Sequence, residues 1–298
     1  MSDEGWFTGL GSSDDGADRI RDGSAADHAN WPSIAIESGI VADKETYYDR
    51  LHEAAMTATR AEVASREQAD DQQLIHAIRA LDDCRRTANE LAERLGEWAG
   101  TVDADAGVGL EYAKTLAASE PTPGQEPIVS LARRVADLAA EADDLEQYVD
   151  QRAPVAAPNL SALAGPVLAA RLISLAGGLE ALAKKPSGTV QVLGAEEALF
   201  AHLRGHASSP KHGILFTHEA VRGTRLEDRG SAARALAGKL SIAARIDHYS
   251  GDYRPELEAE LTDRIETIQA RGTGDTETTS DTDTETDAVT NTGGDDDD

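Results

Sequence analysis

Apolar residues at alternating spacings of three and four run without a break from Ile128 to Val149. This is the period of a heptad seam, so the segment predicts a long amphipathic helix that packs against a partner helix. A similar stripe from Leu74 to Trp98 predicts another long helix. The helix breakers of Pro121–Gly124 lie between the two, which predicts an antiparallel hairpin. An extended coiled coil is favoured over an ordinary core helix pair, because acidic positions surround the seam.

The composition agrees with a mainly α chain. Aromatic residues make up 4% of it, and alanine supplies much of the 40% that is hydrophobic, which favours packed helices over sandwiches or barrels. Further helices are predicted at 43–65, 160–182, 194–204, 227–248 and 255–270, with a short extended piece at 213–217. Residues 8–30 are expected to form a loose connector. The acidic tail is expected to be disordered, because it has almost no apolar side chains.

The segment 160–182 is the most apolar part of the chain and raises the question of a membrane span. Arg171 lies near its centre, where it would cost about 2.5–3.5 kcal/mol in a bilayer. We therefore expect a buried helix capped by Asn159, and no membrane partner. The N-terminus lacks the pattern of a signal peptide, and Cys84 is the single cysteine, so a cytoplasmic protein without a disulfide is expected.

Charge is distributed unevenly along the chain. The whole sequence holds 28 basic and 55 acidic side chains, yet residues 151–250 hold 12 basic and 7 acidic ones. We interpret the acid excess as adaptation to a salt-rich cell. Clustered basic residues usually have a phosphate-bearing partner, so the basic segment predicts nucleic-acid binding. Chance segregation of the charges is the alternative.

The sequence contains no recognisable catalytic motif. A phosphate-binding glycine loop, a nucleophile elbow and a His-Glu-x-x-His pair are all missing. The histidines 202, 206, 212 and 218 form the one metal-like cluster, but no cysteine or carboxylate lies at ligand spacing. Glu196 and Glu197 are adjacent on a predicted helix and point about 100° apart, so they cannot face one substrate atom. We expect no metal site and no enzyme activity.

Residues 158–253 carry motifs that are specific in combination: LAARLISLAG, VQVLGAEEALF, PKHG, ARALAGKL and AARID. This stretch closely resembles the Nop domain of the archaeal scaffold proteins of box C/D small ribonucleoproteins, the partners of fibrillarin. Upstream, LIHAIRALDDCRRTANELAERLGEW resembles the start of the family's coiled coil, and WPSIAIESGIVADKETYYDRLHEA resembles the end of its fibrillarin-binding domain.

The resemblance implies a non-catalytic scaffold without a cofactor of its own. Such proteins dimerise through the coiled coil, hold a kink-turn guide RNA together with a ribosomal-protein-like kink-turn binder, and position fibrillarin. Fibrillarin uses S-adenosylmethionine to methylate a ribose 2′-hydroxyl selected by guide pairing. The implied RNA-contacting residues are Lys184, Gly194, Ala198, Leu199, Phe200, Lys211, His212, Arg229, Arg234, Lys239 and Arg245. Fibrillarin contacts are implied for Trp31, Ile36, Tyr47, Tyr48 and Leu51, and dimer contacts for Leu131, Val135, Leu138 and Leu145.

The resemblance also implies the division of the chain. It predicts a shortened fibrillarin-binding region (1–66), a coiled-coil dimerisation hairpin (67–152), a Nop domain (153–254), a C-terminal helix (255–271) and the acidic tail (272–298). Where the family usually has GAEKALFR, this chain has Glu197 and Ala201, and Ser231 stands where lysine is common. These departures remove positive charge from the predicted RNA surface. An acidic coiled-coil adaptor that binds only proteins is therefore kept as the alternative.

Overall fold

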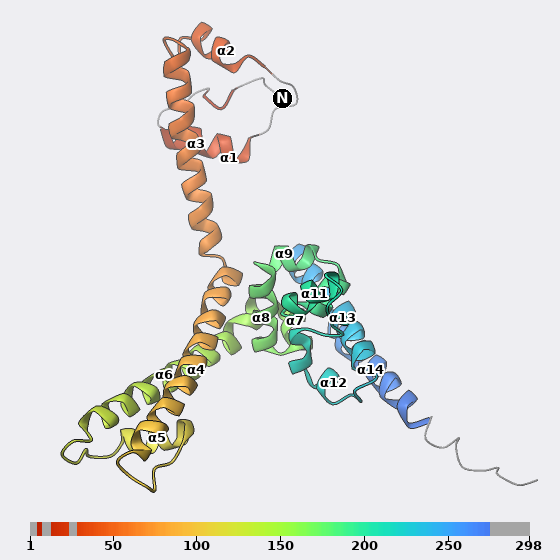
Figure 1. Ribbon diagram of the computed structural model, residues 1–298. Helices are drawn as coiled ribbons and strands as arrows, with labels where there is room; N and C mark the ends of the chain where they lie inside the picture. Colours follow the sequence, from red (N-terminus) through yellow and green to blue (C-terminus); the bar gives the residue numbers. More distant parts are fainter. Residues whose placement is uncertain (1–4, 8–12, 24–28, 275–298) are drawn as a thin grey trace, which may run out of the picture. The chain divides into compact units, whose positions relative to one another are not determined.

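The computed structural model describes residues 5–7, 13–23 and 29–274 (Figure 1). Every regular element among these residues is helical, which confirms the predicted mainly α fold class. The chain divides into two compact units, Met1–Ala156 and Ala157–Asp298. Of the predicted tail, residues 272–274 belong to the last helix, and 275–298 lie outside the described residues.

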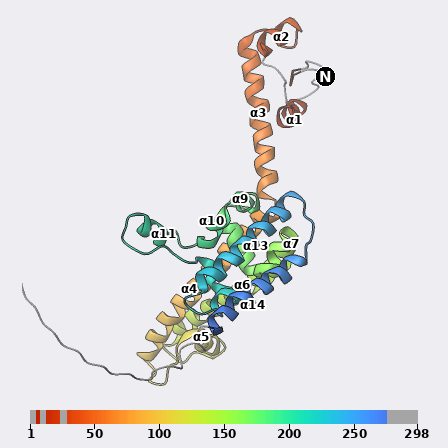
Figure 2. The ribbon, with the colours of Figure 1, turned by 90° about the vertical axis from the view of Figure 1, so that its right-hand side faces the viewer.

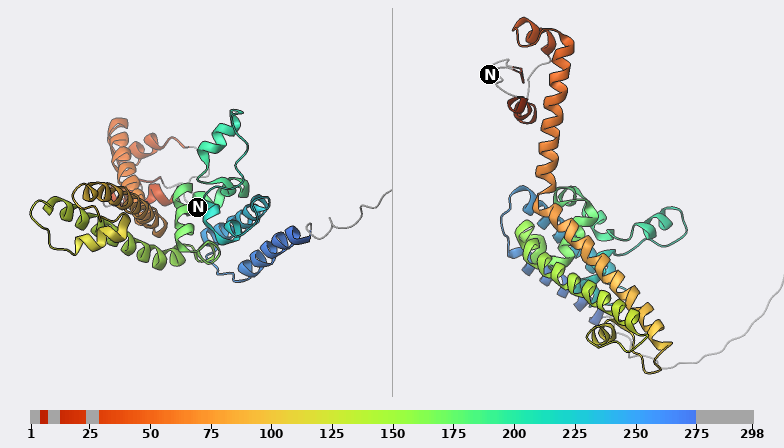
Figure 3. Two further views of the ribbon diagram at one scale, coloured as in Figure 1. Left: turned by 60° about the horizontal axis from the view of Figure 1, so that its bottom comes forward. Right: turned by 90° about the vertical axis from the view of Figure 1, so that its left-hand side faces the viewer.

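The first unit contains the predicted antiparallel hairpin. Its helices, α4 (Asp70–Gly100) and α6 (Glu126–Ala156), lie side by side (Figures 1 and 3). An ion pair between Arg85 and Glu146 links the helices. Leu81 of α4 is fully buried, as the predicted stripe requires.

The predicted seam of α6 is divided between two faces. Four of its members are buried within the hairpin: Ile128, Val135, Ala142 and Val149. Its three leucines, spaced seven residues apart, are only half buried: Leu131, Leu138 and Leu145. Ala132 and Ala139 are buried instead, because a small side chain lets two helix backbones approach closely. The hairpin therefore leaves a stripe of leucines on the flank of its own core.

The tip of the hairpin contains a helix that the sequence analysis did not predict. This helix, α5 (Gly109–Ala117), packs against both α4 and α6. Ala113 is fully buried in a cluster that includes Leu95 and Ile128. A third layer is thus present at this end, contrary to the expectation of a plain two-helix coiled coil.

The N-terminal part of this unit is built on α3 (Lys44–Glu67), with α1 (Ser13–Asp22) and α2 (Trp31–Glu37) packed against it. The Asp43 carboxylate caps α3 by accepting a hydrogen bond from the Thr46 backbone N–H (2.8 Å). Residues 8–30 are not simply a connector, since 13–22 form α1; residues 8–12 and 24–28 lie outside the described part.

The second unit is an all-helical bundle around one long helix, α13 (Arg229–Tyr249) (Figure 2). Its other elements are α7 (Pro158–Ala164), α8 (Pro166–Ala176), α9 (Leu179–Lys184), α10 (Ser187–Val192), α11 (Glu196–Leu203), η1 (Ile214–Thr217), α12 (Glu219–Arg222) and α14 (Glu256–Gly274). The predicted extended piece at 213–217 is therefore a 3₁₀ turn. Most of these elements contact α13 directly. Alanines of α13 are fully buried, among them Ala232, Ala237 and Ala244, which allows this close packing.

The apolar segment 160–182 is not the single helix that the sequence predicts. It is broken at Gly165, which has φ of +77°, and again at Gly177–Gly178. The break at Gly165 follows from its left-handed backbone and from the proline after it, which cannot continue the helix. No single helix of the described residues is long and apolar enough to cross a membrane; α7 and α8 would pass only as a pair, and they are bent by 117°.

A buried polar network joins the ends of α7 and α13. Asn159 is not the predicted cap but the second residue of α7, and the capping group is the Asp247 carboxylate of α13. It accepts hydrogen bonds from the backbone N–H groups of Asn159 (3.0 Å) and Leu160 (2.8 Å). The Asn159 side chain donates to Asp247 (2.6 Å) and accepts from the Arg254 N–H (2.7 Å). Burial raises the pKa of the Asp247 carboxyl, and these hydrogen bonds act in the opposite direction.

We expect Asp247→Ala to destabilise the second unit by about 2–3 kcal/mol, because buried donors at the start of α7 lose their acceptor. Urea unfolding followed by circular dichroism measures the loss, and hydrogen exchange of residues 157–164 localises it. Asp252→Ala is the matched control, because that residue contributes its backbone carbonyl to the network. Equal stabilities of the two variants would contradict the capping role.

Candidate nucleic-acid interface

The residues predicted to contact RNA are concentrated between α10 and α13. Within this stretch α11 stands out from the bundle (Figure 2) and has no buried residue. Phe200 is 59% exposed and Leu203 is 70% exposed. Ala198 is also exposed, and Leu199 is half buried. A helix that presents apolar side chains to solvent on this scale is typical of a surface that a partner covers.

The two ends of this projecting segment are held together. Backbone N–H groups of Gly213 and Ile214 donate to the carbonyls of Gln191 (2.9 Å) and Leu193 (2.7 Å). A Cβ atom at Gly213 would lie 1.9 Å from the Leu193 carbonyl oxygen, so only glycine allows this approach. The Gln191 side chain also donates to the Lys211 carbonyl (2.7 Å). Residues 194–213 therefore project from a fixed base.

Three side chains form a stack at this base. The His212 ring lies 4.9 Å from the Phe216 ring at an interplanar angle of 21°. The guanidinium of Arg229 lies 5.1 Å from the centre of the same ring, and its Nε donates to the Thr224 carbonyl (3.1 Å). The predicted residues His212 and Arg229 are thus brought together, and Lys211 lies exposed beside them. Such a cationic and aromatic cluster can bind phosphate and stack on a base.

Gly194, at the start of the projecting segment, has its N–H bonded to the Glu196 carboxylate (2.9 Å). Glu196 therefore fixes the first turn of α11.

Phe216, the ring at the centre of the stack, was not among the predicted residues. Its position four residues after His212 is the sequence signal that could have identified it.

Three of the other predicted basic residues have partners within the fold. Lys184 pairs with Glu180 on α9 (2.5 Å), and this contact raises the pKa of Lys184. Lys239 pairs with Glu260 of α14. Arg245 donates to the Ala183 carbonyl (3.1 Å) at the end of α9, so its guanidinium links α13 to α9.

Arg245 also lies far along α13 from the stack of His212, Phe216 and Arg229. Arg229 and Arg245 are 16 residues apart on one helix, which is about 24 Å. Arg234 is exposed, in agreement with a contact role. The predicted RNA residues therefore form one group near the start of α13 and several separate sites, not a single face.

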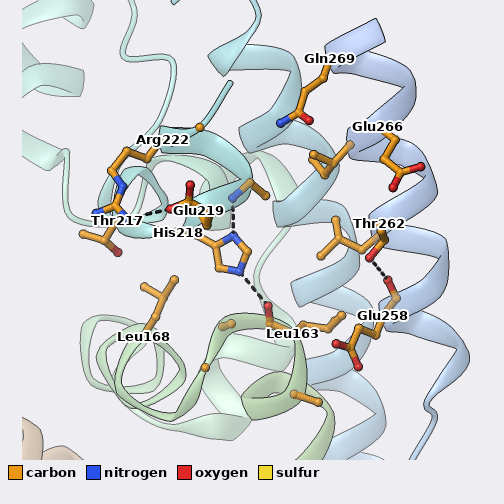
Figure 4. A pocket seen from close by; sticks show the side chains of 17 residues that line it. Leu163, Leu168, Thr217, His218, Glu219, Arg222, Glu258, Thr262, Glu266 and Gln269 are labelled. Atoms are coloured by element: carbon orange, nitrogen blue, oxygen red, sulfur yellow. Dashed lines mark hydrogen bonds and ion pairs between the residues drawn. The ribbon is translucent and has the colours of Figure 1, made fainter. Parts of the chain in front are cut away.

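A groove of about 880 Å³ lies between α7, α8, α12 and α14 (Figure 4). His218 lines it, and both ring nitrogens are used by the backbone. Nε2 donates to the Leu163 carbonyl (3.0 Å), and Nδ1 accepts from the Ala220 N–H (3.1 Å). This arrangement requires the neutral ring, and burial lowers the pKa of His218. His218 thus serves the packing of the unit.

Among the described residues, no group of three His, Cys, Asp or Glu side chains is arranged to hold a metal ion. Three of the four histidines that suggested such a site have separate partners. His202 lies beside the Ala207 carbonyl (3.0 Å), His212 stacks on Phe216, and His218 bonds to the backbone.

The residues predicted to bind fibrillarin form an aromatic cluster in the first unit. Tyr47 is buried and accepts a hydrogen bond from the Trp6 indole (3.1 Å). Trp31, Ile36 and Leu51 are half buried around it. Only Tyr48, at 56% exposure, presents most of its side chain to solvent. The cluster is therefore largely a small core with Tyr48 at its surface.

The structure thus consists of a helical hairpin and a helical domain from which a partly apolar segment projects. The sequence profile of the Nop family, described as the snoRNA binding domain, fibrillarin, matches residues 115–268. A NOP5 family protein of Methanocaldococcus jannaschii is 35% identical over 281 residues, covering 81% of this chain and 68% of the relative. The chain belongs to the Nop family.

Other relatives match a smaller share of their own length. Nucleolar protein 58 of Scheffersomyces stipitis is 33% identical over 67% of this chain and 48% of its own. Nucleolar protein 56 of Caenorhabditis elegans is 42% identical over 47% of this chain and 30% of its own. A chain of a crystallised fibrillarin/Nop5p complex is similar in fold, with a TM-score of 0.52 and 24% identity, covering 88% of this chain and 98% of that chain.

We expect acidification to destabilise the second unit through His218. Because its pKa is lowered in the folded state, the unfolded chain binds the proton first as the pH falls through about 6.5, and stability falls by at most about 1.4 kcal/mol per pH unit. Unfolding between about pH 7.5 and pH 5.5 measures the slope. His218→Gln should give a shallower slope than the original chain, whereas His206→Gln, which removes an exposed histidine, should leave it unchanged.

Proposed function

We propose that this chain is a non-catalytic scaffold of a box C/D guide ribonucleoprotein. It binds a kink-turn RNA together with a ribosomal-protein-like kink-turn binder and positions fibrillarin for 2′-O-methylation of ribose. The observation that carries the proposal is the fixed base of residues 194–213. From this base α11 projects without a fully buried residue, beside Lys211, His212 and Arg229. Membership of the Nop family supports the assignment of RNA to this surface.

In this proposal shape contributes more than charge. The projecting helix carries Glu196 and Glu197, so phosphate attraction at α11 itself is weak. Phe200 and Leu203 are exposed and suit contact with bases or with the kink-turn binder. Because the base of the segment is already bonded, less conformational entropy is lost when the complex forms.

The chemistry is assigned to the partner. Fibrillarin uses S-adenosylmethionine as the methyl donor, and this chain only positions fibrillarin on the RNA. His218, which lines the groove, already uses both ring nitrogens for backbone hydrogen bonds and is not free to act as a base. The fibrillarin contact is proposed around Tyr48, the exposed member of the aromatic cluster, with the protein acting in the cytoplasm.

The leucine stripe supports a homodimer. Leu131, Leu138 and Leu145 are half buried at heptad spacing, so a second hairpin could cover them. Val135 is fully buried within its own hairpin and therefore contributes to the dimer only indirectly.

A protein-only adaptor is the second candidate. Its support is the combination of exposed apolar residues and two glutamates on α11, which also suits a protein surface. The two functions differ in whether assembly requires RNA.

Lys211→Gln should weaken binding to a kink-turn RNA carrying its protein by about fivefold, because one exposed phosphate contact is lost. Binding is measured in molar potassium chloride, with the free kink-turn and a plain duplex as comparisons. Lys114→Gln removes an equal charge from the hairpin and is the control. If the original chain bound its partners equally well without RNA, the adaptor function would replace the scaffold.

Leu138→Glu should convert the dimer to a monomer, because a carboxylate would be buried without a partner at the centre of the leucine stripe. Light scattering after size exclusion gives the mass. Ala140→Glu places the same charge at an exposed position of α6 and should leave the dimer intact. A dimer that survives Leu138→Glu would move the contact away from this stripe.

A further inference from the structure

The end of the last helix lies beside the start of α13. The two helices run antiparallel (Figures 2 and 3): Lys239 pairs with Glu260, and further along Gln269 donates to the Thr224 hydroxyl (3.1 Å). The chain therefore leaves α14 at Gly274 close to the turn that precedes Arg229.

Two arginines meet in a hollow between these helices. The hollow, of about 170 Å³, is lined by Ser231, Arg234 and Ala235 of α13 and by Arg264 and Ile268 of α14. Arg234 and Arg264 form no ion pair with any other described residue. Glu260, one helical turn before Arg264, is taken by Lys239. Two like charges in one hollow, with a hydroxyl beside them, favour a bound anion.

The sequence supplies such an anion directly after the helix. Residues 275–298 contain ten acidic side chains and no basic one. From Gly274 back to Arg264 is ten residues of helix, or about 15 Å. A chain of 24 residues has a root-mean-square reach of about 27 Å if it behaves as a flexible coil, so it is long enough to return to the hollow. Tethering also gives the carboxylates an effective concentration in the millimolar range.

We propose that the acidic segment 275–298 binds the hollow formed by Ser231, Arg234 and Arg264, and competes there with RNA phosphates. Competition with RNA rests on the proposed function, whereas docking of the segment does not. In this arrangement weak, non-specific RNA must displace the segment, whereas a kink-turn complex that also engages α11 gains enough contacts to do so. The segment thus favours the specific RNA over others.

Docking is tested without RNA. The full chain is prepared with its ten tail carboxylates replaced by amides (Asp275→Asn, Glu277→Gln and so on to Asp298→Asn), and a fluorescent peptide of residues 275–298 is titrated in about 0.2 M potassium chloride. We expect binding that weakens about tenfold when Arg234→Gln and Arg264→Gln are added. Lys114→Gln with Arg133→Gln removes the same charge from the first unit and should not weaken it. No binding, or equal binding by both double variants, would overturn docking.

Competition is tested with a plain RNA duplex. Neutralising the tail should raise duplex affinity several-fold in the original chain, and should have no such effect when Arg234→Gln and Arg264→Gln are present. Unchanged duplex affinity despite peptide binding would overturn the competition. If the original chain and its tail-neutralised form bind no RNA but the peptide still binds, the proposed function is overturned and docking of the segment is still supported.

Discussion

The second unit depends on one carboxylate at the end of its central helix. The Asp247 carboxylate accepts hydrogen bonds from the first backbone N–H groups of α7. The Asn159 side chain extends the network to the loop before α14 by accepting a hydrogen bond from the Arg254 N–H. Without this cap the short helix α7 would begin with unpaired buried donors, which is costly. Because α7, α13 and the start of α14 meet here, the network fixes the frame on which α10 to α12 are carried. The projecting α11 can lack buried residues only because that frame is complete without it.

Much of the fold could be predicted from the spacing of apolar residues alone. The hairpin followed from the spacing of Ile128, Val135, Ala142 and Val149, since only a helix places these positions on one face. The α5 helix was missed because its few apolar residues follow an acidic, glycine-rich stretch. Hydrophobicity alone predicts one helix over 160–182, whereas the Gly165–Pro166 and Gly177–Gly178 pairs break it through positive φ angles and the proline ring.

The candidate site was predictable in identity more than in geometry. Motifs placed His212 and Arg229 in the same domain, but their meeting on Phe216 is a tertiary contact between a loop and a helix start. Likewise, sequence shows that Lys239 is basic and cannot show that Glu260 of the next helix neutralises it. Asn159 is a residue type that often caps helices, yet the cap of α7 is the carboxylate of Asp247, 88 positions away.

The excess of basic residues in 151–250 does not translate into a free cationic face. Lys184, Arg222, Arg225 and Lys239 each pair with a glutamate, and Arg245 bonds to carbonyls. Arg204, Lys211 and Arg234 are the residues of this segment most available to an anion, since each is exposed and none forms an ion pair with a described residue. A surface with so few free charges gains little from counterion release, and least of all in strong salt. In the proposed RNA complex, selectivity then comes from the fixed position of the projecting segment, where apolar contacts persist when electrostatic attraction is screened.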